Sequence, residues 1–323
     1  MLDDKVILLT GGTGSFGQKF VEMALKRHNP MVIRVYSRDE LKQWEMMKLY
    51  GNESQVRFFI GDVRDKDRLD RAMDGVDMVI HAAALKQVPF CEYNPIEAVK
   101  TNILGAQNII ECAIDHNIPK VAAISTDKAV SPVNLYGATK MCMEKLLIAA
   151  NAYVGGKRQT RMSCIRYGNV VGSRGSVIPL FLEQKNTGKI TITHKEMTRF
   201  WITLEQGVEF VIKSVSIMHG GEVFIPKVPS MRIMDLAEAI APDCEIDFVG
   251  IRPGEKIHES LLTADEARHS LVFDDCFIIE PEHTWWNRDK ITGGKELPEG
   301  FCYESDKNDW WLSKDELQKM ISE

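Results

Sequence analysis

Short apolar runs alternate with longer amphipathic stretches along the first half of the chain. Each run ends in glycine or other small residues and predicts a buried strand, and the spacing between apolar positions in the stretches predicts helices. The predicted strands are 5–10, 32–36, 56–60, 78–81, 121–124 and 162–166, and the predicted helices are a segment ending near Arg27, then 66–73 and one long helix over 95–116. This alternation predicts an α/β fold with a doubly wound parallel sheet.

A glycine-rich turn follows the first predicted strand and opens the first helix. Glycines let the backbone turn tightly and approach a pyrophosphate, while the helix N-terminus favours its negative charge. Between a strand and a helix, this turn predicts a dinucleotide site. Its spacing is G-x-x-G-x-x-G, and its expected contacts are Gly11, Thr13, Gly14, Ser15, Phe16 and Gly17.

The end of the second strand bears on the choice between NAD and NADP. NAD-binding folds usually place an acidic residue there to hold the ribose 2′-hydroxyl. This chain has Ser37 and Arg38, with Lys42 one turn further on. A hydroxyl and two cations suit a 2′-phosphate, so NADP is favoured. Two alternatives stay open: the cations are ordinary surface charges, or Asp39 holds the ribose of NAD.

The next two strands are expected to complete the cofactor site. Asp62, followed by Val63, can meet an adenine amino group at the end of the third strand. Ala82 and Ala83 follow the fourth strand and leave room for the nicotinamide ribose, although small residues are equally ordinary in a core.

The segment 125–140, STDKAVSPVNLYGATK, begins at the end of the fifth strand, where open α/β sheets bind ligands. Tyr136 and Lys140 lie one helical turn apart on the same face. A cationic lysine beside a phenol favours the phenolate, so the tyrosine could act as a base below its ordinary pKa of about 10. A tyrosine four residues before a lysine is common by chance. The pair becomes a candidate for catalysis because the glycine turn predicts a cofactor site in the same domain.

Length and composition limit the classes of protein to which this chain can belong. The 323 residues are 44% hydrophobic, which is enough for a large core. We expect an NADP-binding domain at 1–168, to which later segments return, and a mainly substrate-binding lobe at 169–323. A net charge of −6 without a basic tract argues against nucleic acid as a partner. The absence of a signal peptide or long apolar run predicts no membrane span. Seven scattered cysteines favour reduced thiols in the cytoplasm and no metal site.

The two motifs together resemble the extended short-chain dehydrogenase/reductase family over essentially the whole chain. The resemblance rests on TGGTGSFG (10–17) and on Tyr136 with Lys140. It implies that Tyr136 is the base for a sugar hydroxyl and that Lys140 holds the phenolate and the nicotinamide ribose. Thr126, upstream of the tyrosine, matches the hydroxyl that supports it.

A finer resemblance starts at Thr126-Asp127-Lys128. Hexose-type 4,6-dehydratases carry Asp-Glu after this threonine, and 4-epimerases lack the acid pair. The chain is similar to the inverting UDP-N-acetylglucosamine 4,6-dehydratases. These are small soluble enzymes that begin bacterial pseudaminic-acid and related surface-sugar pathways. Their configuration-retaining relatives are usually longer membrane proteins that lack the tyrosine. The similarity extends to SRDELKQWEM (37–46), HAAALKQVP (81–89) and RPGEKIHE (252–259).

This resemblance implies a mechanism with NADP and UDP-N-acetylglucosamine. Tyr136 removes the C4 hydroxyl proton while hydride leaves C4, Lys128 removes the C5 proton, and Asp127 protonates the departing C6 hydroxyl. Hydride then returns to C6, and C5 is reprotonated on its opposite face. A base must be neutral, so the site is expected to lower the pKa of Lys128 by burial or nearby positive charge.

Substrate contacts are expected mainly from the second half of the chain. Arginines are suited to a bidentate grip on phosphate, with surface salt bridges as the alternative. The expected contacts are Lys86 (also a cofactor contact), Asn169 near the diphosphate, Val177 beneath the sugar, Arg199, Arg252 and, at the ribose, Glu255.

Two other functions stay open, a UDP-sugar 4-epimerase in which Asp127 and Lys128 only hold the loop, and a non-catalytic NADP-binding protein. Intact Thr126, Tyr136 and Lys140 count against the second. We expect a homo-oligomer, whose subunit number the sequence does not give. A tryptophan-rich tail could cover the site, form an interface or, as we favour, pack in the lobe; it holds Trp285, Trp286, Trp310 and Trp311.

Overall fold

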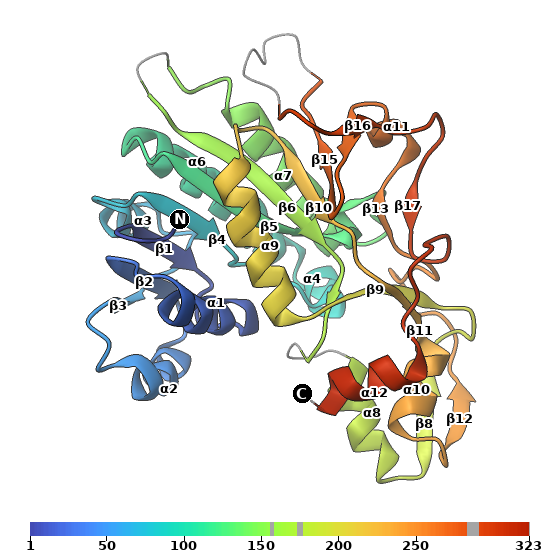
Figure 1. Cartoon of the computed structure of the whole chain (residues 1–323). Coiled ribbons are helices and arrows are strands. Elements are labelled where there is room, and N and C mark those ends of the chain that lie inside the picture. The colour runs from blue at the N-terminus through green and yellow to red at the C-terminus, as the bar shows by residue number, and fades with distance from the viewer. Residues whose placement is uncertain (156–157, 173–176, 283–290, 323) are drawn as a thin grey trace.

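The computed structural model describes residues 1–155, 158–172, 177–282 and 291–322. Within them, the central sheet has ten strands in the order β16-β14-β15-β10-β6-β5-β4-β1-β2-β3. The strands from β10 to β3 pair in parallel, while β15, β14 and β16 extend one edge antiparallel. Helices α1 and α9 cover one face, and α3, α6 and α7 cover the other (Figure 1). The predicted doubly wound parallel sheet is confirmed.

The predicted strands of the first half are present to within two residues at either end, and all but the edge strand 56–60 are mostly buried apolar runs. The strands are β1 (Val6–Thr10), β2 (Val32–Ser37), β3 (Val56–Ile60), β4 (Met78–His81), β5 (Lys120–Thr126), β6 (Arg161–Tyr167), β10 (Val223–Pro226), β14 (Ser270–Val272), β15 (Cys276–Ile279) and β16 (Lys295–Glu296). The helices packed around them are α1 (Ser15–Arg27), α2 (Glu40–Tyr50), α3 (Lys66–Met73), α4 (Val88–Tyr93), α5 (Pro95–Val99), α6 (Gly105–Asp115), α7 (Leu135–Ala150), α9 (Leu204–Ile217) and α11 (Ala264–Ala267), with a 3₁₀ turn η2 (Asp127–Ala129) after β5.

The single long helix predicted over 95–116 is wrong, because a π-helical turn, η1 (Lys100–Leu104), separates α5 from α6. The turn carries Asn102, whose buried amide donates to Leu85 O at 2.9 Å and to Thr139 Oγ1 at 2.9 Å. Leu85 N donates back to Asn102 Oδ1 at 2.8 Å. The turn therefore ties the loop after β4 to α7, two segments that border the site.

A second, smaller hydrophobic core forms a lobe beside the sheet (Figure 1). Because β10, β14, β15 and β16 belong to the main sheet, the chain after residue 168 contributes to both bodies. Trp311 stacks against Arg232 of the lobe, and Trp285 and Trp286 lie outside the described residues. The remaining elements, most of them in the lobe, are β7 (Asn169–Val170), α8 (Val177–Lys185), β8 (Lys189–Ile192), β9 (Thr198–Ile202), β11 (Ser230–Arg232), α10 (Ile233–Ile240), β12 (Glu245–Phe248), β13 (Ser260–Leu262), β17 (Tyr303–Glu304) and α12 (Lys314–Ser322).

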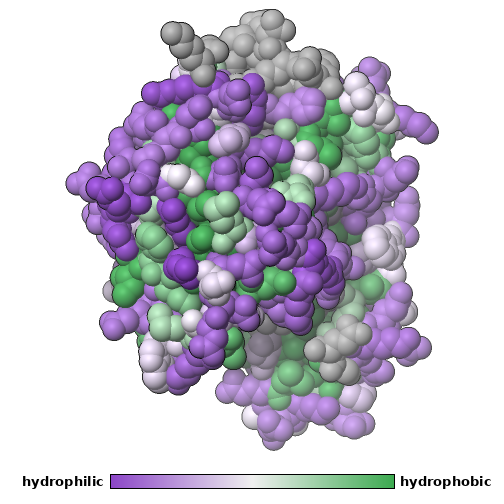
Figure 2. Space-filling model, turned by 60° about the vertical axis from the view of Figure 1, so that its left-hand side comes forward, coloured by the Kyte–Doolittle hydropathy of each residue, from purple (hydrophilic) through white to green (hydrophobic). Residues whose placement is uncertain are grey.

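The surface is mainly polar on the face shown in Figure 2, where hydrophobic residues are scattered in small groups among hydrophilic ones. In the described part of the chain, no helix is both long and apolar enough to cross a membrane. The hydrophobic residues are instead used in the two cores.

Candidate active site

A cavity of about 1120 Å³ runs along the carboxyl ends of the parallel strands and reaches the lobe. Nearly all residues predicted for the site line this cavity, from the glycine turn to Arg252 and Glu255. The two exceptions are Gly17 and Asp127. Gly17 packs α1 against the turn, since a Cβ there would lie 2.4 Å from Gly12 O.

The cofactor end of the cavity is shaped by a close backbone approach. Gly11 has φ +67°, and a Cβ on it would lie 2.8 Å from Ala83 N. Any side chain at Gly11 would thus be strained and would collide with the segment after β4. The turn and the Ala82–Ala83 backbone form a cradle open to a pyrophosphate and ribose, which fits a dinucleotide.

The acidic residue that follows β2 has a structural role at the start of α2. The Asp39 carboxylate caps α2 by accepting from Lys42 N at 3.0 Å, and Lys42 Nζ pairs with it at 2.8 Å. Arg38 is 55% exposed and lies 3.7 Å from Asp62, at the cavity edge. The carboxylate that could hold an NAD ribose is therefore already engaged, while Arg38 is accessible.

Tyr136 and Lys140 are both buried on α7, but their charge states differ from the simple expectation. Burial raises the pKa of the Tyr136 phenol to about 12, against the opposing effects of the Lys128 charge and the Thr126 hydroxyl. Burial also lowers the pKa of Lys140 to about 8. The pKa of Tyr136 therefore lies above 10 in this structure, against the expectation, and the Lys128 charge is a cause that opposes the rise.

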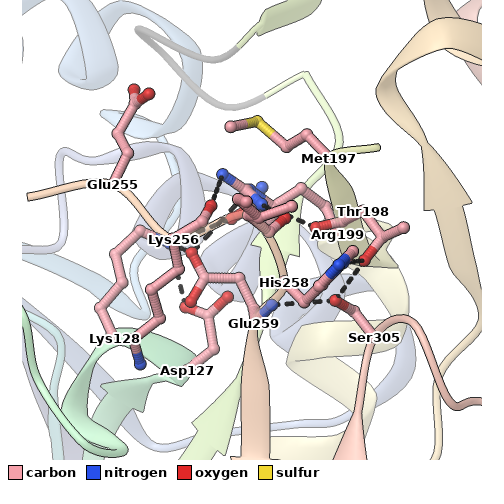
Figure 3. A network of polar contacts seen from close by, with 12 residues as sticks. Asp127, Lys128, Met197, Thr198, Arg199, Glu255, Lys256, His258, Glu259 and Ser305 are labelled. Carbon is pink, nitrogen blue, oxygen red and sulfur yellow. Dashed lines mark hydrogen bonds and ion pairs between the residues drawn. The ribbon is translucent and has the colours of Figure 1, made fainter. Parts of the chain in front are cut away.

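The Thr126-Asp127-Lys128 segment forms a tight polar group at the end of β5, and Figure 3 shows its Asp127 and Lys128 side chains. Thr126 Oγ1 donates to Asp127 Oδ1 at 2.8 Å, and Lys128 Nζ lies 3.1 Å from the same oxygen. Lys128 Nζ also donates to Asn169 Oδ1 at 3.3 Å. Asp127 has no exposed surface, whereas Lys128 reaches the cavity.

Lys128 is a cation in this environment. Burial would lower its pKa, but the carboxylates of Asp127 and Glu259 outweigh burial and raise the pKa above its ordinary value. The expectation of a lowered pKa is wrong, because it counted only burial and nearby positive charge. Lys86, which lines the cavity, is a nearby amine whose pKa is lowered by burial and by the Lys128 charge.

Glu259, the residue before β13, was not among the site residues predicted from the sequence. Its Oε1 lies 3.6 Å from Lys128 Nζ and 3.8 Å from Arg199 Nε, and it lines the cavity. The only signal was its place at the end of RPGEKIHE, where we singled out Arg252 and Glu255. Proximity to Lys128 depends on chain packing that this signal does not contain.

Arg199 does not present the predicted bidentate grip. Its Nη1 donates to Thr198 O at 2.7 Å and Ile257 O at 2.9 Å, and its Nη2 donates to Lys256 O at 3.0 Å. Two of these three hydrogen bonds hold the segment before Glu259 in place. Arg252 is different, because its side chain is 57% exposed at the cavity rim and lies 3.9 Å from Glu255.

The fold and these residues define an extended short-chain dehydrogenase/reductase with a sugar-nucleotide type of site. The chain belongs to the family described as polysaccharide biosynthesis protein, whose model matches residues 7–281. A protein of Campylobacter jejuni named UDP-N-acetylglucosamine 4,6-dehydratase (inverting) is 49% identical, covering 100% of this chain and 98% of that protein. A Rickettsia conorii protein named UDP-glucose 4-epimerase is 46% identical, covering 86% and 84%. The crystal structure of Pen from Bacillus thuringiensis is 41% identical with a TM-score of 0.91, covering 100% and 98%.

Proposed function

We propose that this protein is a 5-inverting UDP-N-acetylglucosamine 4,6-dehydratase that uses NADP. The observation that carries the proposal is the charged group of Asp127, Lys128 and Glu259 (Figure 3), whose Lys128 and Asp127 charges also act on Tyr136. An oxidation at C4 alone needs one proton-transferring residue, whereas elimination of water needs more. The Campylobacter relative, similar over the full length of both chains, supports the same reaction.

Tyr136 is proposed to accept the C4 hydroxyl proton, with Thr126 beside its phenol. NADP, when bound, would supply the acceptor for the C4 hydride and the donor of the hydride that reaches C6. Because Lys128 is an ammonium with three donors and no acceptor, we assign it as the acid that protonates the leaving C6 hydroxyl. Asp127 then holds Lys128 in place from behind, a role that suits its complete burial. This assignment gives Lys128 the acid role that was expected of Asp127, and it gives Asp127 a positioning role.

The preference for NADP is supported by the residues at the end of β2 and just after it. Asp39 is engaged in capping α2, and Arg38 lies exposed beside the cavity. Ser37, Arg38 and Lys42 are proposed to hold the 2′-phosphate, and Lys140 the nicotinamide ribose. At the other end, Lys86, Asn169, Arg252 and Glu255 are proposed to hold the UDP-sugar.

The second candidate is a UDP-sugar 4-epimerase, favoured by the Rickettsia relative. Incubation of the purified protein with UDP-N-acetylglucosamine and NADP, followed by mass spectrometry, separates the two. A dehydratase gives a product lighter by one water, and an epimerase leaves the mass unchanged. A product of unchanged mass, with the sugar epimerised at C4, would refute the dehydratase.

We also propose a homo-oligomeric, cytoplasmic enzyme that supplies a pseudaminic-acid type of surface-sugar pathway. All seven cysteines are free thiols, as is usual in a reducing compartment. Light scattering at several concentrations measures the subunit number, and a monomer at all of them would contradict the oligomer.

A further inference from the structure

Residues 252–255 form a tight turn on the rim of the cavity. Glu255 N donates to Arg252 O at 3.1 Å, and Gly254 has φ +80°. A proline in the second position and a glycine with positive φ in the third are typical of a type II turn. All four residues line the cavity, so the turn carries the proposed substrate contacts Arg252 and Glu255 at its two ends.

A single side chain joins this turn to the helix that carries Tyr136. Asn134 Nδ2 donates to Gly254 O at 2.8 Å, while Asn134 Oδ1 accepts from Gly137 N at 2.8 Å and so caps α7. Tyr136 lies in the first turn of that helix. The contact is close, because a Cβ on Gly254 would lie only 3.0 Å from Asn134 Cβ. The turn is therefore held directly against the start of α7.

The chain just after the turn is joined to the loop that carries Asp127 and Lys128. Lys256 Nζ donates to Val130 O at 2.5 Å, and Val130 N donates to Asp127 O at 3.1 Å. The backbone of Lys256 is fixed as well, since its O accepts from Arg199 Nη2 at 3.0 Å (Figure 3). The same short segment is thus tied to both elements that carry the proposed proton-transferring groups.

Resting on the dehydratase function proposed above, we propose that Asn134 and Lys256 are positioning residues, which couple the turn that binds the UDP part of the substrate to the catalytic groups on α7 and η2. Neither residue lines the cavity, so each acts through the segment that it holds. Once a ligand fixes the turn, the two hydrogen bonds place the sugar against both groups. Binding free energy from the nucleotide, which does not react, is then used to align the sugar, and small misplacements of reacting groups lower rates strongly.

Two variants cut these ties and leave the turn itself unchanged. Asn134→Ser keeps a good N-cap, because a hydroxyl also accepts from the backbone of α7, but its side chain is too short to reach Gly254 O. Lys256→Met keeps the apolar stem of the side chain and removes the donor to Val130 O.

Each variant is loaded with NADP. The affinity for UDP is measured by titration calorimetry, kcat by the release of water from UDP-N-acetylglucosamine, and stability by urea unfolding. Asn134→Ser and Lys256→Met are expected to bind UDP as the wild type does, while kcat falls by about 10–10²-fold. Lys256→Arg, which keeps a donor, should recover part of the kcat. The matched controls, Asn52→Ser and Lys5→Met at exposed positions away from the cavity lining, should equal the wild type in all three measurements.

Three results overturn the positioning roles. The first is a wild-type kcat in either variant, and the second is weaker binding of UDP at an unchanged kcat, which would show that the ties serve binding alone. The third is a joint fall of UDP affinity and kcat with a lower midpoint of urea unfolding, which would show a structural role. If the wild type epimerises the sugar without releasing water, the dehydratase is refuted, and comparing UDP affinity with the epimerisation rate still tests the two ties.

Discussion

The ammonium of Lys140 lies 3.0 Å from the sulfur of Met143, one turn further along α7. A thioether is a weak acceptor, so it offsets little of the free energy lost when the ammonium is buried. This explains why the pKa of Lys140 falls to about 8 from its ordinary value of 10.5. Burial of Lys140, which we propose to bind the ribose, therefore lowers the stability of the cofactor-free protein.

Lys140→Met should therefore stabilise the cofactor-free protein at pH 7. Between pH 8 and 10.5 the unfolded state binds the lysine proton and the folded state does not, so wild-type stability rises with pH in this window. We expect the variant to be more stable by roughly 3 kcal/mol at pH 7, from about 1.4 kcal/mol per pKa unit, with the difference vanishing above pH 10.5. Urea unfolding from pH 7 to 11 measures it, and a difference independent of pH would contradict the burial argument.

Arg38→Ala should weaken NADP binding far more than NAD binding. The variant loses a charge-assisted hydrogen bond to the 2′-phosphate, worth about 1.5–3 kcal/mol, that NAD never makes. Titration of the cofactor-free protein with each dinucleotide measures the two affinities, so that NAD is the internal control. Equal weakening of both would refute the 2′-phosphate contact.

Arg199 and Arg252 should behave differently when replaced. Arg199→Lys leaves backbone carbonyls of the buried segment before Glu259 without their donors, and the free energy of unfolding should fall by about 1–3 kcal/mol. Arg252→Ala, at an exposed side chain, should change stability by less than about 0.5 kcal/mol but raise the KM for UDP-N-acetylglucosamine. Equal losses of stability in both variants would contradict this division of roles.

The proposed cycle is redox-neutral, because the hydride taken from C4 returns to C6. Turnover should need no added oxidant or reductant, and substrate deuterated at C4 should give product deuterated at C6. Nuclear magnetic resonance of the product locates the label. Steady release of free NADPH, or loss of the label to solvent, would exclude the mechanism.

Local patterns in the sequence were enough to predict the strands of the first half, the glycine turn and the pairing of Tyr136 with Lys140, whereas Thr126 was assigned through the family resemblance. Strand and helix periods, a turn that needs glycine at Gly11, and a four-residue spacing on α7 are all properties of neighbouring residues. The π turn at Lys100–Leu104 was not predictable in this way, because it is held by Asn102 contacts to Leu85 and Thr139, far along the chain.

The chemistry of the site depended on segments that meet only in the folded protein. Asp127 and Glu259 together raise the pKa of Lys128, and Glu259 takes part only because folding brings the residue before β13 to 3.6 Å from Lys128. Arg199 serves the backbone because β9 lies against the segment before Glu259. A pKa and an accessible face both depend on the charges and the solvent around a group in three dimensions, and these are set by tertiary packing rather than by neighbours in the sequence.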